Sequence, residues 1–212
     1  TVARRRQADA HQRRLTRQAG EGHLTLMREE LDEIAMTPDA IPDRRLALMF
    51  ACAHPHIEPA MRSPLILQTV LGLTAADIGA AFLVPAGTMG QRLVRAKTRI
   101  GQMGIGFEIP DAADLPARLD AVLDAIYAAY AKGWTDPAGE DGGQLAEEAI
   151  WLGRLVVALL PDAPEAKGMP ALMLYSHARR AARRDAEGAY VPLERQDTAL
   201  WDLDAIGAAE AL

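Results

Sequence analysis

The chain has 212 residues, a formal net charge of −6, 50% hydrophobic residues and 5% aromatic residues. This length allows one large or two small domains with a sizeable core, and the abundance of alanine and leucine favours helix over strand. A single cysteine excludes an internal disulfide framework, and no uninterrupted apolar run approaches the roughly 20 residues that a bilayer span needs, so we expect a cytoplasmic all-α protein without a membrane segment.

The first predicted segment, residues 1–38, is basic at its start. Seven arginines lie between Arg4 and Arg28, against two acidic residues. It lacks the apolar core and cleavage site of a signal peptide. Four apolar residues in its second half recur at helical spacing: Leu24, Met27, Leu31 and Ile34. We therefore expect a basic helical linker, either with a solvated face or acting as an arm that contacts phosphates.

Short helices are predicted between residues 39 and 83. Asp43 is a suitable N-cap for the first, which stops before Pro55. A second closes at Gly72, and Thr74 is a suitable N-cap for a third. These boundaries predict three helices in close succession.

The next predicted helix runs from Pro85 to about Met103 and carries two stripes. Its apolar face consists of Met89, Leu93, Ala96 and Ile100. A polar stripe runs beside it, with Gln91 near the helix start: Thr88, Arg92, Arg95 and Arg99. Residues 84–103 include four basic residues and no acidic one. Burial of the apolar stripe would leave the arginines at the surface, where their planar guanidinium groups suit guanine edges and phosphates.

Residues 72–100 therefore predict a helix-turn-helix, whose second helix enters the major groove of DNA. Periodicity and charge alone are equally consistent with a solvated basic face on an ordinary bundle helix. The wider sequence is needed to separate the two interpretations.

Beyond this motif, residues 104–116 form a predicted linker, and the charge then reverses. Twelve acidic residues stand against four basic ones in residues 104–175. Residues 117–212 form a predicted acidic helical extension, with helices over 117–132, 143–160 and 169–184 and a weaker one from 193 onward. Helix pairs of this size are similar to tetratricopeptide arrays, although the sequence has no clean 34-residue period.

Two stretches, LTAADIGAAFLVP and GTMGQRLVRAK, lie within residues 39–103. They resemble the DNA-binding region-four domain of extracytoplasmic-function (ECF) RNA polymerase sigma factors. The resemblance extends to a subgroup with a long C-terminal extension, through the stretch from EEAIWLGRLVVALLPDAPEAKGMP to RRDAEGAYVPLERQDTALWD. Three positions depart from the family pattern: Gly79, Leu83 and Gly90.

The resemblance implies a protein that recognises the promoter −35 element and docks on the flap of the RNA polymerase β subunit. It places four residues on DNA-facing positions of the recognition helix, with Arg99 one turn further: Thr88, Gln91, Arg92 and Arg95. We expect no enzymatic activity and no cofactor. Nothing before Asp43 supplies a region-two domain, so we expect that this chain does not initiate transcription as it stands. The alternative is a helical scaffold whose helix-turn-helix docks protein rather than DNA.

Candidate metal and catalytic sites are weak. Cys52, His54 and His56 fall short of four zinc ligands, so a buried cysteine beside turn histidines is the better interpretation. The acidic run that begins at Glu140 has no histidine, lysine or serine nearby to complete an acid–base or nucleophilic set. We therefore expect no metal site and no catalytic residue.

The acidic extension suggests an intramolecular contact. Its charge is opposite to that of the predicted recognition helix, so it could lie against the arginines and mask them. A cluster of four arginines near the end of the third predicted helix of the extension is expected to stabilise that helix end: Arg179, Arg180, Arg183 and Arg184.

Overall fold

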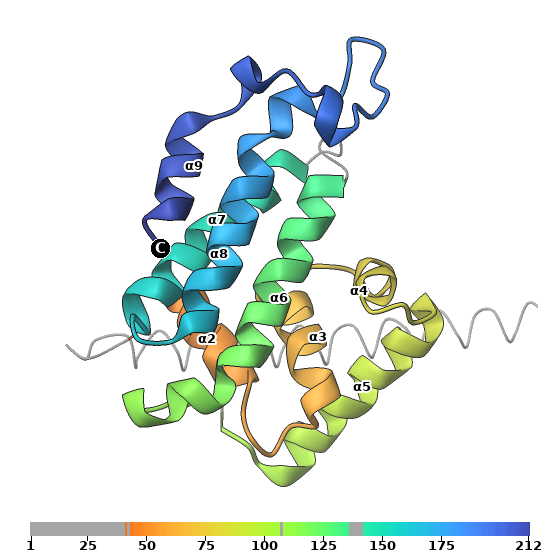
Figure 1. Cartoon of the computed structure of the whole chain (residues 1–212). Helices are drawn as coiled ribbons and strands as arrows, with labels where there is room; N and C mark the ends of the chain where they lie inside the picture. The colour runs from red at the N-terminus through yellow and green to blue at the C-terminus, as the bar shows by residue number, and fades with distance from the viewer. Residues whose placement is uncertain (1–40, 42, 107, 136–141) are drawn as a thin grey trace, which may run out of the picture.

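The computed structural model describes residues 41, 43–106, 108–135 and 142–212 (Figure 1). Within these ranges the regular structure is helical, and the β-type pairing is one isolated bridge between Arg184 and Tyr190. The predicted all-α class is confirmed. None of the described helices is long and apolar enough to cross a membrane. The predicted basic linker, residues 1–38, lies outside the described residues.

Four helices form the first half of the described chain: α2 (Arg44–Cys52), α3 (Pro59–Thr69), α4 (Ala75–Ala81) and α5 (Ala86–Met103). Both predicted N-caps are present. The Asp43 carboxylate accepts a hydrogen bond from the Leu46 amide at 2.9 Å, and the Thr74 side chain forms a capping box with Asp77. At its other end α5 stops at Gly104, which adopts a left-handed conformation with φ 59°.

The second half begins with a 3-10 turn, η1 (Ala112–Asp114), and has four α-helices: α6 (Leu115–Thr135), α7 (Gly142–Leu159), α8 (Pro164–Ala178) and α9 (Leu203–Glu210). The first two agree closely with the predicted helices. The third begins earlier than predicted, because Pro164 occupies the first turn, where its missing N–H costs nothing.

The chain between α8 and α9 differs from the predicted helices over 169–184 and from 193 onward. After Ala178 it forms three short 3-10 turns: η2 (Arg180–Ala182), η3 (Leu193–Arg195) and η4 (Thr198–Leu200). The carboxylates of Asp197 and Asp202 each accept a backbone hydrogen bond and restart the helical conformation, so α9 begins only at Leu203.

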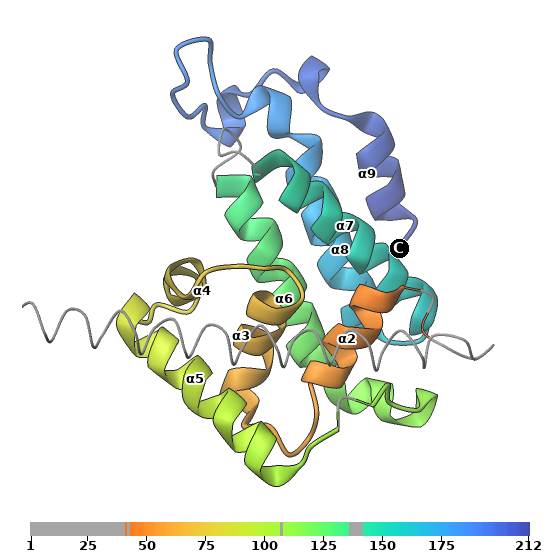
Figure 2. The same ribbon diagram turned by 180° about the vertical axis from the view of Figure 1, so that it is seen from behind.

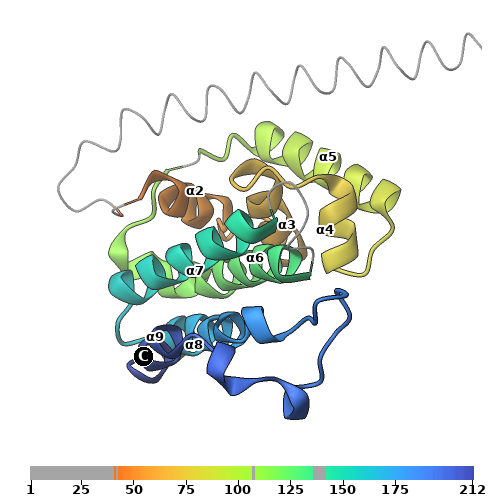
Figure 3. The same ribbon diagram turned by 90° about the horizontal axis from the view of Figure 1, so that it is seen from above.

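The described helices form three layers (Figure 3). The first contains α2 to α5, the second α6 and α7, and the third α8 and α9. Helix α6 contacts α2, α3 and α4 of the first layer, α7 beside it in the middle layer, and α8 of the third layer. The middle layer therefore lies between the predicted DNA-binding segment and the end of the extension.

A single hydrophobic core runs through these layers. Phe50 and Ile66 of the first half and Val122 and Ile126 of α6 are all buried in it. In the predicted linker, residues 104–116, Leu115 is buried too. The two halves therefore share their interior.

Polar contacts also join the halves. The Lys132 ammonium lies 2.9 Å from the Asp77 carboxylate and connects α6 to α4. Arg118, which is 6% exposed, donates from Nη1 to the Phe50 carbonyl at 3.1 Å and connects α6 to α2. An ion pair between Arg45 and Glu148 connects α2 to α7, which lie side by side in Figure 2.

Candidate nucleic-acid interface

The turn between α4 and α5 determines how the two helices meet. The Val84 amide donates to the Gly79 carbonyl at 2.8 Å, so the turn folds back over the end of α4. A Cβ atom on Gly79 would lie 2.5 Å from the Val84 carbonyl oxygen. Glycine is therefore required where the resembled family usually has alanine.

Leu83 lies in the same turn and is unusual in two ways. Its φ is 55°, in the left-handed region that favours glycine, and its side chain is 93% exposed. The family pattern often has glycine here. The turn thus keeps the left-handed conformation without the residue that adopts it most easily.

The apolar stripe of α5 is buried as the spacing predicts. Met89, Leu93 and Ile100 belong to the core, and Ala96 packs against it. The helices that α5 contacts most are α3 and α4. Their apolar side chains therefore fix the rotation of α5 about its own axis.

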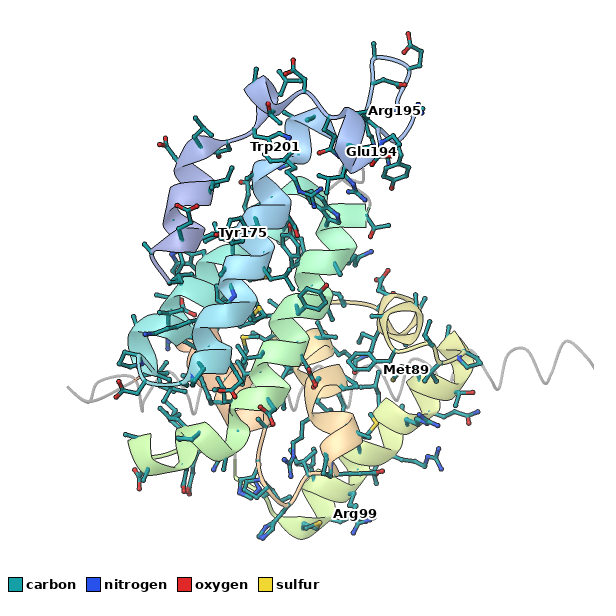
Figure 4. The ribbon with its side chains drawn as sticks, in the orientation of Figure 1. Met89, Arg99, Tyr175, Glu194, Arg195 and Trp201 are labelled. Carbon is teal, nitrogen blue, oxygen red and sulfur yellow. The ribbon has the colours of Figure 1, made fainter. Side chains whose placement is uncertain are left out.

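That rotation leaves the predicted contact residues at the surface. All five are exposed: Thr88, Gln91, Arg92, Arg95 and Arg99. Figure 4 shows Arg99 on the outer side of α5, whereas Met89 lies nearer α4. Within the described part of the chain none of the three arginines forms an ion pair. Among the described residues, the predicted residues therefore lie together on one exposed, positively charged face of α5.

Gly90 lies on a different side of α5 from the arginines. It is half-buried, and a Cβ atom there would meet the Ala75 Cβ of α4 at 3.7 Å, an ordinary contact. Gly90 therefore faces α4, and the helix surface directed at solvent loses no side chain through it.

Lys97, the fourth basic residue of α5, also lies apart from the exposed arginines. It is half-buried, and burial lowers its pKa. Nearby, burial raises the pKa of the Cys52 thiol to about 12. Cys52 is thus an unreactive core residue, while His54 and His56 lie in the following turn with ring centroids 5.0 Å apart. No group of three or more potential metal ligands occurs among the described residues.

The described part of the acidic extension leaves the arginine stripe uncovered. Helices α6 to α9 lie on the other side of α2, α3 and α4 from it, as Figure 3 shows. Two of the extension's carboxylates are engaged elsewhere, Glu147 with Arg180 and Glu148 with Arg45. In this arrangement α6 of the extension packs against α3 and α4, on the side away from the arginine stripe of α5.

Comparisons with known proteins found one family model that matches the extension and a relative that matches most of the chain. Residues 118–212 match the model of a family described as a family of unknown function, DUF6596. The chain is also 42% identical over 172 residues to an uncharacterized protein of Rhizobium meliloti (strain 1021). That alignment covers 80% of this chain and 41% of the relative, so the chain spans less than half of the relative's length. No solved structure matches.

Proposed function

We propose that this chain is the promoter-binding part of an ECF sigma factor. In this proposal α4 and α5 form the helix-turn-helix, and α5 enters the major groove at the −35 element. The observation that carries the proposal is the division of α5 into a buried apolar stripe and an exposed arginine stripe that forms no ion pair with the described residues. The chain acts without catalysis or cofactor, and it acts in the cytoplasm, where RNA polymerase works.

The order of residues along α5 suggests which of them read bases. In helix-turn-helix proteins the N-terminal residues of the recognition helix contact base edges. Thr88, Gln91 and Arg92 lie in that half of α5, and Arg95 follows one turn after Gln91. With a rise of about 1.5 Å per residue, Arg99 lies about 10 Å further along the α5 axis than Arg92. At that distance from the helix start it is better placed to contact a phosphate than a base edge.

Docking on the β flap of RNA polymerase rests on the same sequence resemblance, as does transcription initiation by the whole protein. The described structure adds a physical role for the extension. Helix α6 holds α4 through the core and through Lys132, so the extension positions the helix-turn-helix.

Selection of bound duplexes from a random DNA pool, followed by affinity measurements at several salt concentrations, tests the proposal. We expect an enriched sequence motif and a log–log salt slope of about −0.9 for each phosphate contact. If no DNA motif is enriched and purified protein partners bind through α5, the chain would instead be a helical scaffold that docks protein.

A further inference from the structure

A second concentration of positive charge lies at the end of α8, in the third layer, away from α5 (Figure 1). Here the ends of α6 and α8 meet the start of α7 around a cavity of about 30 Å³. Three arginines line it: Arg180, Arg183 and Arg184. Trp134 and His177 complete its polar and aromatic wall.

Two of these guanidinium groups are held in fixed orientations by neutral groups. Arg183 donates from Nη1 to the Trp134 carbonyl at 2.6 Å, and its guanidinium lies 4.2 Å from the Trp134 ring centroid and 4.8 Å from that of Tyr190. Arg184 donates to the Gly188 carbonyl at 2.6 Å and lies 4.1 Å from the Tyr190 centroid. Cation–π and carbonyl contacts orient these cations but do not neutralise them.

Among the described residues, the cavity lining contains three cations and no carboxylate. Glu147 is not part of the lining, but its carboxylate lies 3.4 Å from Arg180 Nη1. Because this contact is long and the Glu147 side chain is 65% exposed, it neutralises little of the Arg180 charge. The start of α7 adds positive potential through its helix dipole. Like charges brought together in this way repel unless an anion joins them.

His177 supplies an independent observation. Its Nδ1 atom is buried and has no hydrogen-bond partner among the described residues. Buried polar atoms are normally satisfied by protein, water or ligand. His177 also lines the arginine cavity, so an imidazole with an unsatisfied buried nitrogen lies beside the three arginines.

We propose that this cavity binds a small oxyanion of the phosphate class, either free phosphate or the phosphoryl group of a monoester. Guanidinium groups donate parallel pairs of N–H bonds to phosphate oxygens, which matches the three arginines. The cavity lies at the end of α8, away from α5, so this site is separate from the α5 surface.

Thermal unfolding of the full chain tests the site, with inorganic phosphate replacing chloride at constant ionic strength. We expect phosphate at several times its Kd to raise Tm by about 2–4 °C. Arg180→Gln should weaken phosphate binding at least about tenfold, since a charge-assisted contact is lost. Arg154→Gln, which removes an exposed arginine of α7 outside this cavity, is the matched control and should behave like the parent chain. Isothermal titration with phosphate, O-phosphoserine and adenosine monophosphate distinguishes a free ion from a monoester.

Three outcomes would overturn the proposal. One is an unchanged Tm in phosphate. Another is an equal rise in the parent chain and Arg180→Gln, which would be a general salt effect. The third is phosphate binding that appears only after Asp136, Glu140 and Asp141 are all replaced by their amides, because the chain's own carboxylates would then be the partners of the arginines.

Discussion

At the residue scale, the arginines of α5 carry the proposed function. Arg92→Ala and Arg95→Ala should each weaken binding to the selected duplex, by about 1–3 kcal/mol if the residue reads a guanine. Replacing a residue that contacts only phosphate should instead reduce the magnitude of the log–log salt slope by about 1. It should also weaken binding to all DNA sequences by a similar factor. Fluorescence anisotropy at several salt concentrations separates the two. Arg154→Ala removes the same charge from α7 and should leave affinity unchanged; unchanged affinity in both α5 variants would contradict the proposal.

Leu83 is a position where the native residue costs stability. A non-glycine residue in the left-handed region costs roughly 1–2 kcal/mol, and the exposed Leu83 side chain recovers little of this by packing. Leu83→Gly should therefore raise the free energy of unfolding by about 1 kcal/mol, measured by urea denaturation. A loss of stability would show that the leucine makes a compensating contact.

Two glycines, Gly79 in α4 and Gly90 in α5, should respond oppositely to the same substitution. Gly90→Ala should stabilise the protein by up to about 1 kcal/mol, because alanine is the better helix former and its Cβ fits against Ala75. Gly79→Ala should destabilise it, because the new Cβ would collide with the Val84 carbonyl oxygen. Urea denaturation of both variants beside the parent checks the two signs. If both substitutions changed the free energy of unfolding in the same direction, the close packing of Gly79 against the turn at Val84 would be contradicted.

At the element scale, Asp77 joins the cap of α4 to α6. Hydrogen bonds to its carboxylate lower the pKa of Asp77: the largest effect comes from the Thr74 hydroxyl and the next from the Lys132 ammonium. Because folding lowers this pKa, the ionised Asp77 side chain stabilises the folded state. That contribution is fully present above the pKa of the unfolded chain, near 3.8, and is lost as the pH falls below it.

Asp77→Asn should therefore lower the free energy of unfolding by roughly 0.5–1 kcal/mol at pH 7, a small effect because the pair is partly exposed. The difference from the parent should shrink as the pH falls through 4 toward 3. Urea denaturation across this range measures it. Asp162→Asn, in the exposed turn before α8, is the control and should change the free energy of unfolding little at pH 7. A constant difference at all pH values would exclude the charge of Asp77 as the cause.

At the scale of the whole molecule, the shared core predicts cooperative unfolding of both halves. Ile126 is fully buried in α6, so Ile126→Ala should cost about 2–5 kcal/mol. All three tryptophans lie in residues 117–212, so their fluorescence reports on the extension, while the proposed DNA binding would report on α4 and α5. The two signals should be lost together in urea, for the parent and the variant alike. Leu172→Ala, at an exposed position of α8, should change little, and two separate transitions would show that the halves fold independently.

The predictable part of the fold and of the candidate site was local. The caps at Asp43 and Thr74, the helical spacing of Met89, Leu93 and Ile100, and the adjacent arginines all depend on residues within a few positions of one another. The unpredicted part has non-local causes. The 3-10 turns after Ala178 interrupt a stretch whose composition favours helix, and the arginine cavity combines residues from α6, α7 and α8.

The sequence by itself determined the all-α class and the two faces of α5, because helix periodicity and capping are properties of neighbouring residues. Only the tertiary structure decided that α6 packs against α3 and α4, so that the described part of the extension leaves the arginines of α5 exposed. The extension could either cover the arginines of α5 or pack behind α4. Which of the two occurs depends on which apolar faces pack together, and the net charge of the extension does not specify this. Hydrophobic burial of α6 between two layers, rather than attraction between an acidic and a basic segment, sets the arrangement of this protein.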